Sequence, residues 1–145
     1  MNHPLLRAGM WFLTFVEVAV GLVATLAPRF FYDNVPWVDL APPFAEHLMR
    51  DYGAMNLALG LVTAVAAVTM STVMVRTALV AYLLFAVPHL LFHLTHQQHH
   101  TTSQAVGETT AFTIAVLLPL ALLALSWRAG SPQYRGPLRR REGRY

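Results

Sequence analysis

The chain has 145 residues and a formal charge of +3, and 56% of its residues are hydrophobic while only 12% are charged. A soluble domain carries about 25% charged residues, so this composition indicates an integral membrane protein with a single domain. The absence of cysteine excludes disulfides, thiolate metal sites and cysteine nucleophiles, and arginines gathered in a C-terminal tail without interleaved aromatic residues do not indicate a nucleic-acid partner.

The first apolar segment, residues 6–27, is long enough to cross the roughly 30 Å of hydrocarbon in a membrane. Glu17 lies near the middle of this segment, on the helical face that also carries Thr14 and Gly21. Small residues of this kind pack one membrane helix against another, and a carboxyl group is costly to expose to lipid. We therefore expect Glu17 to face protein, and it is a candidate catalytic acid or base.

The second apolar segment, residues 51–70, follows a long loop at 28–43 that is rich in aromatic residues and proline. We expect this loop to lie on the membrane surface or to cap the helices. Tyr52 and Asn56 share one face of the segment and are candidate ligand-binding residues, although Asn56 could equally hydrogen-bond a neighbouring helix. Asp51 lies at the outer end, either as a metal ligand or as part of a solvated helix start.

The third and fourth apolar segments cover residues 77–96 and 107–127. Four histidines follow the spacing i, i+4, i+7 and i+11 along the third segment and beyond it: His89, His93, His96 and His100. On a continuous helix all four lie within an arc of roughly 60°. Polar side chains are rarely exposed to lipid, so this stripe indicates a polar site. Glu108 begins the fourth segment at about the depth of His96.

Arginine placement predicts the orientation of the four segments. With both termini in the cytoplasm, eight of the ten arginines lie on the inner side, and only Arg29 and Arg50 lie on the outer side, in agreement with the positive-inside rule. Residues 130–145 are predicted to form a basic, disordered cytoplasmic tail. The predicted fold is thus an all-α, four-helix bundle in the cell membrane, formed by residues 1–129, with the lipid bilayer as its first partner.

The histidine stripe and the neighbouring carboxylates predict a divalent metal site. The predicted ligands are three imidazoles and two carboxylates: His89, His93, His96, Asp51 and Glu108. Such a set suits zinc, iron or copper. Haem is the second candidate; it needs axial ligands on facing helices, and His47 opposite His93 or His96 is the pair that the chain offers.

Two short stretches resemble a known family. The sequence Gly-Ala-Met-Asn-Leu-Ala-Leu-Gly at 53–60, together with Pro28, Phe31 and Tyr32 in the preceding loop, is similar to the small DoxX-like membrane proteins. The resemblance implies a four-helix bundle that works beside redox partners, and it implies no catalytic residue.

These features lead to one main hypothesis and two alternatives. The main hypothesis is a small multi-pass membrane protein with an outward-facing site of histidines and carboxylates that binds a metal or a small lipophilic ligand. One alternative is a non-catalytic accessory subunit, in a homo-oligomer or a larger membrane complex, since a fold by itself implies no function. The other is a membrane enzyme in which Glu17 and His89 perform acid–base chemistry on a lipid-like substrate.

Overall fold

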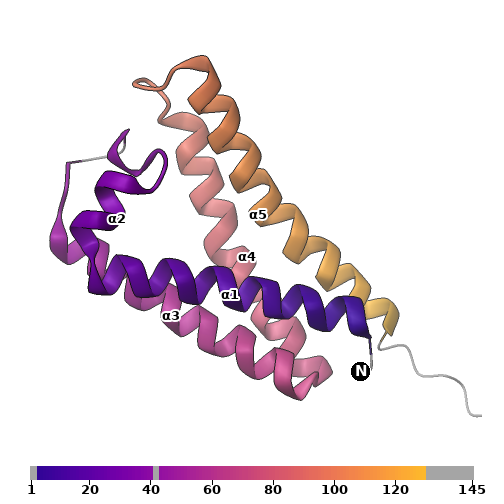
Figure 1. Cartoon of the computed structure of the whole chain (residues 1–145). Coiled ribbons are helices and arrows are strands. Elements are labelled where there is room, and N and C mark those ends of the chain that lie inside the picture. The colour runs from indigo at the N-terminus through magenta and orange to yellow at the C-terminus, as the bar shows by residue number, and fades with distance from the viewer. Residues whose placement is uncertain (1–2, 41–42, 130–145) are drawn as a thin grey trace, which may run out of the picture.

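A computed structural model describes residues 3–40 and 43–129 of the chain. All regular structure in these residues is helical: α1 (Pro4–Leu26), α2 (Pro28–Asn34), the short 3-10 helix η1 (Val38–Leu40), α3 (Glu46–Thr69), α4 (Thr72–Thr95) and α5 (Thr102–Ala129), as Figure 1 shows. The helices α1, α3, α4 and α5 are long and apolar enough to cross a membrane. The predicted all-α fold is confirmed, and the predicted tail at 130–145 lies outside the described residues.

The last three long helices start earlier than the hydrophobic segments predict. They begin at Glu46, Thr72 and Thr102 rather than at 51, 77 and 107. Hydrophobicity marks the apolar part of a helix, whereas the helix itself continues for as long as its backbone hydrogen bonds are satisfied. At the start of α4, for example, the Ser71 hydroxyl accepts a hydrogen bond from the Met74 backbone N–H at 3.3 Å and caps the helix.

Helices α1 and α3 pack together more extensively than any other two helices of the described chain. Their backbones approach closely at glycines: a Cβ atom on Gly21 would lie 2.9 Å from the Gly53 carbonyl oxygen. Two to three turns away, the Thr14 hydroxyl donates a hydrogen bond to the Thr63 hydroxyl at 3.1 Å. Small residues and hydroxyls therefore join these two helices, as the sequence predicts.

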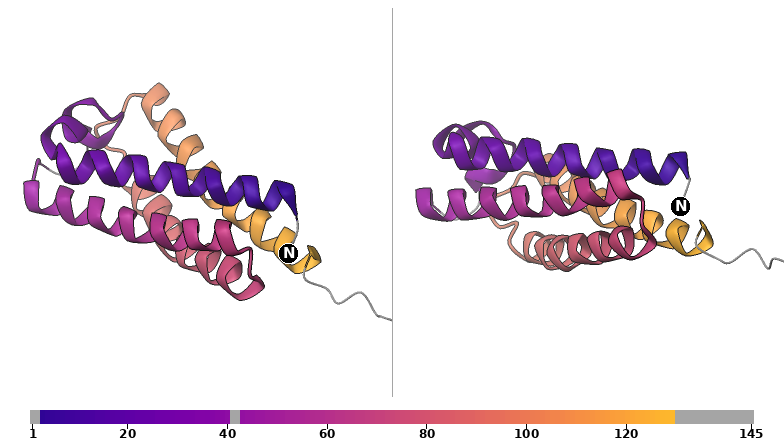
Figure 2. Two further views of the ribbon diagram at one scale, coloured as in Figure 1. Left: turned by 60° about the horizontal axis from the view of Figure 1, so that its bottom comes forward. Right: turned by 90° about the horizontal axis from the view of Figure 1, so that it is seen from below.

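The four long helices form two pairs, α1 with α3 and α4 with α5. The pairs meet near the short turn at Met70, whose left-handed backbone (φ 48°) ends α3. From there they diverge, as Figures 1 and 2 show. Apolar side chains from all four helices fill the closed end: Leu6, Met10, Leu13, Ala66, Ala67, Met70, Val75, Ala78, Leu79, Leu122 and Leu123. The start of α1 and the end of α5 also lie at this end.

The segment α2–η1 covers the open end of the bundle. Phe31 of α2 is buried, and its ring lies 6.0 Å from the ring of Tyr52 on α3. Trp37, between α2 and η1, has a left-handed backbone (φ 70°), and its indole lies against Gly107 of α5, where an added Cβ would come within 3.0 Å of Cζ2. The segment that was expected to lie on the membrane surface or to cap the helices thus packs against α3 and α5, and the absence of a side chain at Gly107 leaves room for Trp37.

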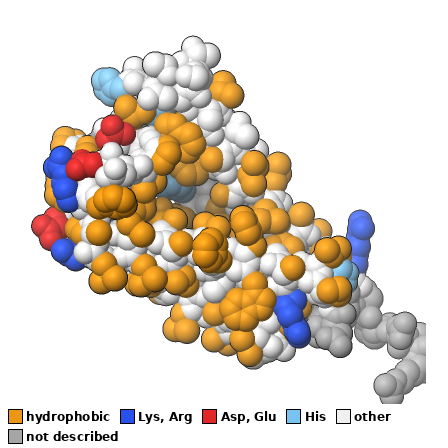
Figure 3. Space-filling model, in the orientation of Figure 1, with side chains coloured by type: hydrophobic (Ala, Val, Ile, Leu, Met, Phe, Trp, Pro, Cys, Tyr) orange, Lys and Arg blue, Asp and Glu red, His pale blue; other side chains and the backbone are white. Residues whose placement is uncertain are grey.

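The surface carries its charges at the ends of the helices and hydrophobic side chains between them (Figure 3). Leu5, Phe15, Leu61 and Leu84 are among the large apolar side chains that are mostly exposed. At the open end, Arg50 binds Glu46 at 2.8 Å and also donates to the Thr25 carbonyl near the end of α1. This distribution is what helices surrounded by lipid require.

Candidate functional site: a capped cavity with a polar end

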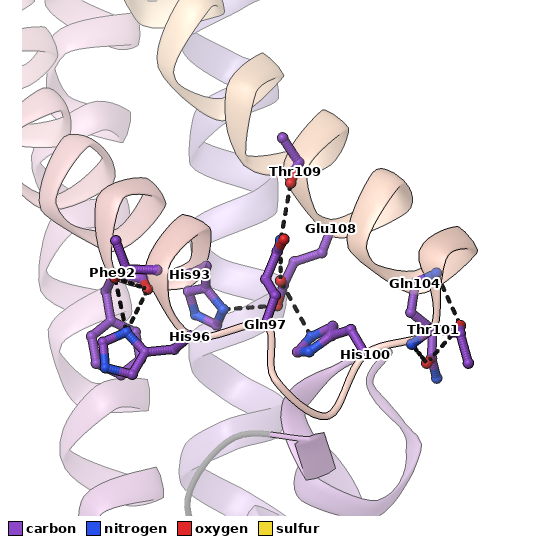
Figure 4. A network of polar contacts seen from close by, with 10 residues as sticks. Phe92, His93, His96, Gln97, His100, Thr101, Gln104, Glu108 and Thr109 are labelled. Carbon is purple, nitrogen blue, oxygen red and sulfur yellow. Dashed lines mark hydrogen bonds and ion pairs between the residues drawn. The ribbon is translucent and has the colours of Figure 1, made fainter.

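The centre of the candidate site is a buried pair between α4 and α5. His93 Nδ1 lies 2.7 Å from Oε1 of Glu108, and the Glu108 side chain has no exposed surface. Gln97, just after α4, donates from Nε2 to the other carboxylate oxygen at 3.3 Å and to the Thr109 hydroxyl at 3.0 Å. Figure 4 shows these side chains converging on Glu108. A carboxyl group in this position needs such partners because burial removes its contacts with water.

His100 is a site residue that the sequence analysis left outside the predicted metal ligands. It lies in the link between α4 and α5, and only 3% of its side chain is exposed. Its Nε2 lies 3.3 Å from Oε2 of Glu108, which is close enough for an ion pair, but the angles are not those of a hydrogen bond. Both ring nitrogens of His100 are therefore buried without a hydrogen-bond partner among the described residues. The helical spacing i+11 does not explain this placement, because α4 ends at Thr95 and the link that follows carries His100 to Glu108.

His96 is not part of the site around Glu108, because α4 ends at Thr95. His96 is the C-terminal cap and has a non-helical backbone (φ −125°, ψ 46°), so the stripe does not continue on one helical face. Its exposed ring stacks on Phe92 with the centroids 4.1 Å apart, and Nδ1 lies 2.8 Å from the Phe92 carbonyl oxygen. In Figure 4 the two rings lie away from Glu108.

Asp51 also lies apart from the other predicted ligands. Its carboxylate binds Nε2 of His47 at 3.1 Å on the exposed side of α3, where 90% of the His47 side chain is exposed. The five predicted metal ligands are therefore not brought around one point, and the described part of the chain contains no group of three or more His, Cys, Asp or Glu residues placed to hold a metal ion. His47, one member of the predicted haem pair, lies on this exposed side of α3 and is paired with Asp51.

His89 lies one turn deeper than His93 and is surrounded by aromatic rings. Its ring centroid is 4.6 Å from that of His93, 4.7 Å from Phe112 of α5, 5.2 Å from Phe85 and 6.3 Å from Tyr52 of α3. The described residues make no hydrogen bond to its ring nitrogens. His89 is thus held by ring contacts with three helices while its polar atoms remain available to another molecule.

A cavity of about 280 Å³, which we call the capped cavity, lies between α2–η1 and the long helices. Most of its wall is apolar or aromatic: Val20, Phe31, Val35, Pro36, Trp37, Val38, Met49 and Phe112. The polar wall residues come from α3, α4 and α5: Tyr52, His89, His93 and Glu108. A second hollow of about 300 Å³, the end hollow, shares Trp37, His93 and Glu108 with this cavity and is also lined by His96, His99 and His100. The His93–Glu108 pair and Trp37 therefore separate the two spaces.

The other predicted ligand-binding residue, Asn56, serves packing. It is buried, and its Nδ2 donates to the Tyr52 carbonyl of the same helix at 2.7 Å. It is not among the residues that line the capped cavity. Of the two predicted ligand-binding residues, Tyr52 therefore lines the cavity and Asn56 does not.

Glu17 is buried, as expected, with 3% of the residue exposed. Tyr82 of α4 is its hydrogen-bonding neighbour, and the carboxyl oxygen Oε2 has no hydrogen-bond partner among the described residues. Glu17 does not line the capped cavity. It and His89 are the two predicted catalytic candidates. Both are neighbours of Tyr52, but no hydrogen bond or ion pair joins them among the described residues.

Comparison with known proteins adds no family to this description: no family model, curated protein or solved structure matches the chain. The resemblance to DoxX-like proteins stays a prediction.

Proposed function

We propose that this protein binds a small lipophilic ligand in the capped cavity, with the polar head of the ligand beside His89, His93 and Glu108. The observation that supports the proposal most is the composition of the wall, which is apolar on most sides and polar at one place. Ligand pockets in proteins have this composition, and their volumes start at about 300 Å³, close to that of the capped cavity.

The charges at the site favour a neutral head group. Glu108 already places a buried carboxyl group in the wall, and no Arg or Lys is among the described residues that line the cavity. An anionic head would have to be buried beside the Glu108 carboxyl group without an Arg or Lys to pair with it. A hydroxyl or carbonyl oxygen avoids burial of this further charge and can hydrogen-bond the ring nitrogens of His89.

We also propose that the chain spans the cell membrane with both termini in the cytoplasm, so that the capped cavity lies in the outer half of the bilayer. The asymmetry of the arginines supports this orientation. The four apolar helices and the charges at their ends support a membrane location.

Trp37 offers a direct test because its side chain lines the capped cavity. Substitution of Trp11 and Trp127 by Phe leaves Trp37 as the sole tryptophan of the chain. In the detergent-purified protein, 8-bromooctan-1-ol should quench its fluorescence with a saturable dependence on concentration. The matched acid, 8-bromooctanoic acid, should bind more weakly because of its charge.

The variant His89→Phe keeps the aromatic ring and removes the hydrogen-bonding nitrogens. We expect it to weaken binding of the alcohol roughly fivefold, the value of about one hydrogen bond. His47→Phe is the matched control, since His47 is exposed on α3 and lies outside the cavity. Quenching that never saturates, or that is the same in both variants, would contradict the proposal and favour a non-catalytic accessory subunit instead.

A further inference from the structure

We infer that the ligand of the capped cavity is a long-chain neutral amphiphile, such as an acyl or isoprenoid alcohol or ketone, whose hydrocarbon tail lies in an open groove between α3 and α4. The inference rests on the proposed function for the head group and adds the class of ligand and the place of its tail. It also implies that the ligand enters sideways from the bilayer.

The groove, which we call the lateral groove, results from the divergence of the two helix pairs (Figure 1). It has a volume of about 730 Å³ and opens widely on the side of the molecule. Its wall is apolar apart from one histidine, and it includes Ala58 and Val62 of α3 and Ala81, Leu84, Pro88 and His89 of α4. If α3 and α4 cross a membrane, this opening faces hydrocarbon.

His89 connects the lateral groove with the capped cavity. Of the described residues, His89 alone lines both spaces. The neighbouring wall consists of side chains, since the rings of Tyr52 and Phe85 lie 6.2 Å apart beside it. Pro88 leaves the Leu84 carbonyl without its usual helical donor. The inference requires that the side chains beside His89 rotate to join the two spaces.

The capped cavity and the lateral groove are arranged like the head and the tail of a lipid in the membrane. The groove extends along α4 from His89 back to Ala81. It thus runs away from the end of α4 where His93 lies beside Glu108 of α5. A molecule with its head at His93 and its tail in the groove would point its tail towards the middle of the membrane. Amphiphiles of the outer leaflet have this same orientation.

The length of the groove favours a hydrocarbon tail over a helix of another protein. On α3 its wall runs from Met55 to Val62, which is about 12 Å of helix. A membrane-spanning helix is about 30 Å long and 10–12 Å wide and needs a longer contact surface. A flexible chain with one polar end fits a short groove that leads to a polar site.

The test is a competition experiment with the full chain that carries Trp37 as its sole tryptophan. Unbrominated octan-1-ol and hexadecan-1-ol displace 8-bromooctan-1-ol, and recovery of Trp37 fluorescence reports their affinities. The variant Ala58→Phe fills the groove from an exposed position on α3. We expect it to weaken the binding of hexadecan-1-ol at least tenfold and to change the affinity for octan-1-ol less than twofold. Because each alcohol is compared between variants, its partition into detergent cancels.

Ala111→Phe is the matched control, since Ala111 is exposed on α5 and does not line the groove. This variant should leave the affinity for both alcohols unchanged. Ala81→Phe fills the same groove from α4 and replaces Ala58→Phe if that variant does not fold. Equal effects of the filling variants on both alcohols, or no effect on hexadecan-1-ol, would overturn the inference while leaving the short-ligand site intact. Absence of saturable binding by 8-bromooctan-1-ol itself would overturn the proposed function and the inference with it.

Discussion

At the scale of single residues, the site depends on how a buried carboxyl group is satisfied. Glu108 has no exposed surface and meets His93, Gln97 and His100. All three come from the end of α4 and the link that follows it, so the fold of this link determines the surroundings of Glu108. The ring nitrogens of His100 are buried without a hydrogen-bond partner among the described residues. His89 makes ring contacts there, and its nitrogens are polar atoms that a ligand can use.

We expect the His93–Glu108 pair to affect stability mainly because removal of one partner leaves the other buried and unpaired. Replacing His93 alone by Leu leaves the Glu108 carboxyl group buried without its closest partner, which costs about 3–5 kcal/mol for a buried pair. The double variant His93→Leu/Glu108→Leu should recover much of this loss, because no orphaned charge remains. Thermal unfolding in detergent measures both effects, and His99→Leu, at an exposed position, is the control. A double variant less stable than His93→Leu alone would contradict this account.

At the scale of elements, the pair α1–α3 and the segment α2–η1 have different roles. The two long helices approach at glycines, where a side chain would meet backbone atoms. The short segment places Phe31 and Trp37 over the open end and so forms one wall of the capped cavity between the diverging helices. The first contact sets how closely α1 and α3 approach, and the second provides part of the wall of the site.

Adding a side chain at Gly53 tests the role of the close approach. In Gly53→Val the new carbon atoms would meet the Gly21 carbonyl oxygen and the backbone of Thr25, neither of which can move without shifting a helix. We expect a loss of about 1–3 kcal/mol in unfolding free energy, as for other overpacked positions. Ala54→Val, at an exposed position on the same helix, should change stability little. Equal stability of the two variants would show that the helices are not held by this contact.

At the scale of the whole molecule, the two helix pairs form a wedge that is filled with apolar side chains at one end and capped at the other. The end with the core carries both the start of α1 and the end of α5. The orientation that we propose places this end at the cytoplasm and the polar site at the outer face, where a ligand from the outer leaflet can reach it.

Because the chain has no cysteine, single cysteines can report this orientation. Gln98→Cys lies in the exposed link at the capped end, and Thr69→Cys lies at the exposed end of α3. A thiol reagent that does not cross membranes should label Cys at 98 in intact cells and Cys at 69 only after the membrane is opened. The reverse pattern would overturn the proposed orientation.

The sequence by itself determined the features that depend on local composition. The lengths of the apolar segments predicted four long helices, and small residues on the faces of Glu17 and Asn56 predicted which sides are buried. These predictions succeed because both depend on positions a few residues apart along one helix. The helix starts were less accurate, because a polar residue such as Ser71 can cap a helix beyond its apolar part.

Only the tertiary structure decided which polar residues meet. Periodicity assumed that the histidine stripe continues along one helix, but the backbone changes direction at His96 and carries His100 to Glu108 instead. The capped cavity depends on the angle between the helix pairs and on the left-handed backbone of Trp37, and neither is encoded in a local pattern. Tertiary packing therefore decides which residues form the site, because the site depends on contacts between residues far apart in the chain.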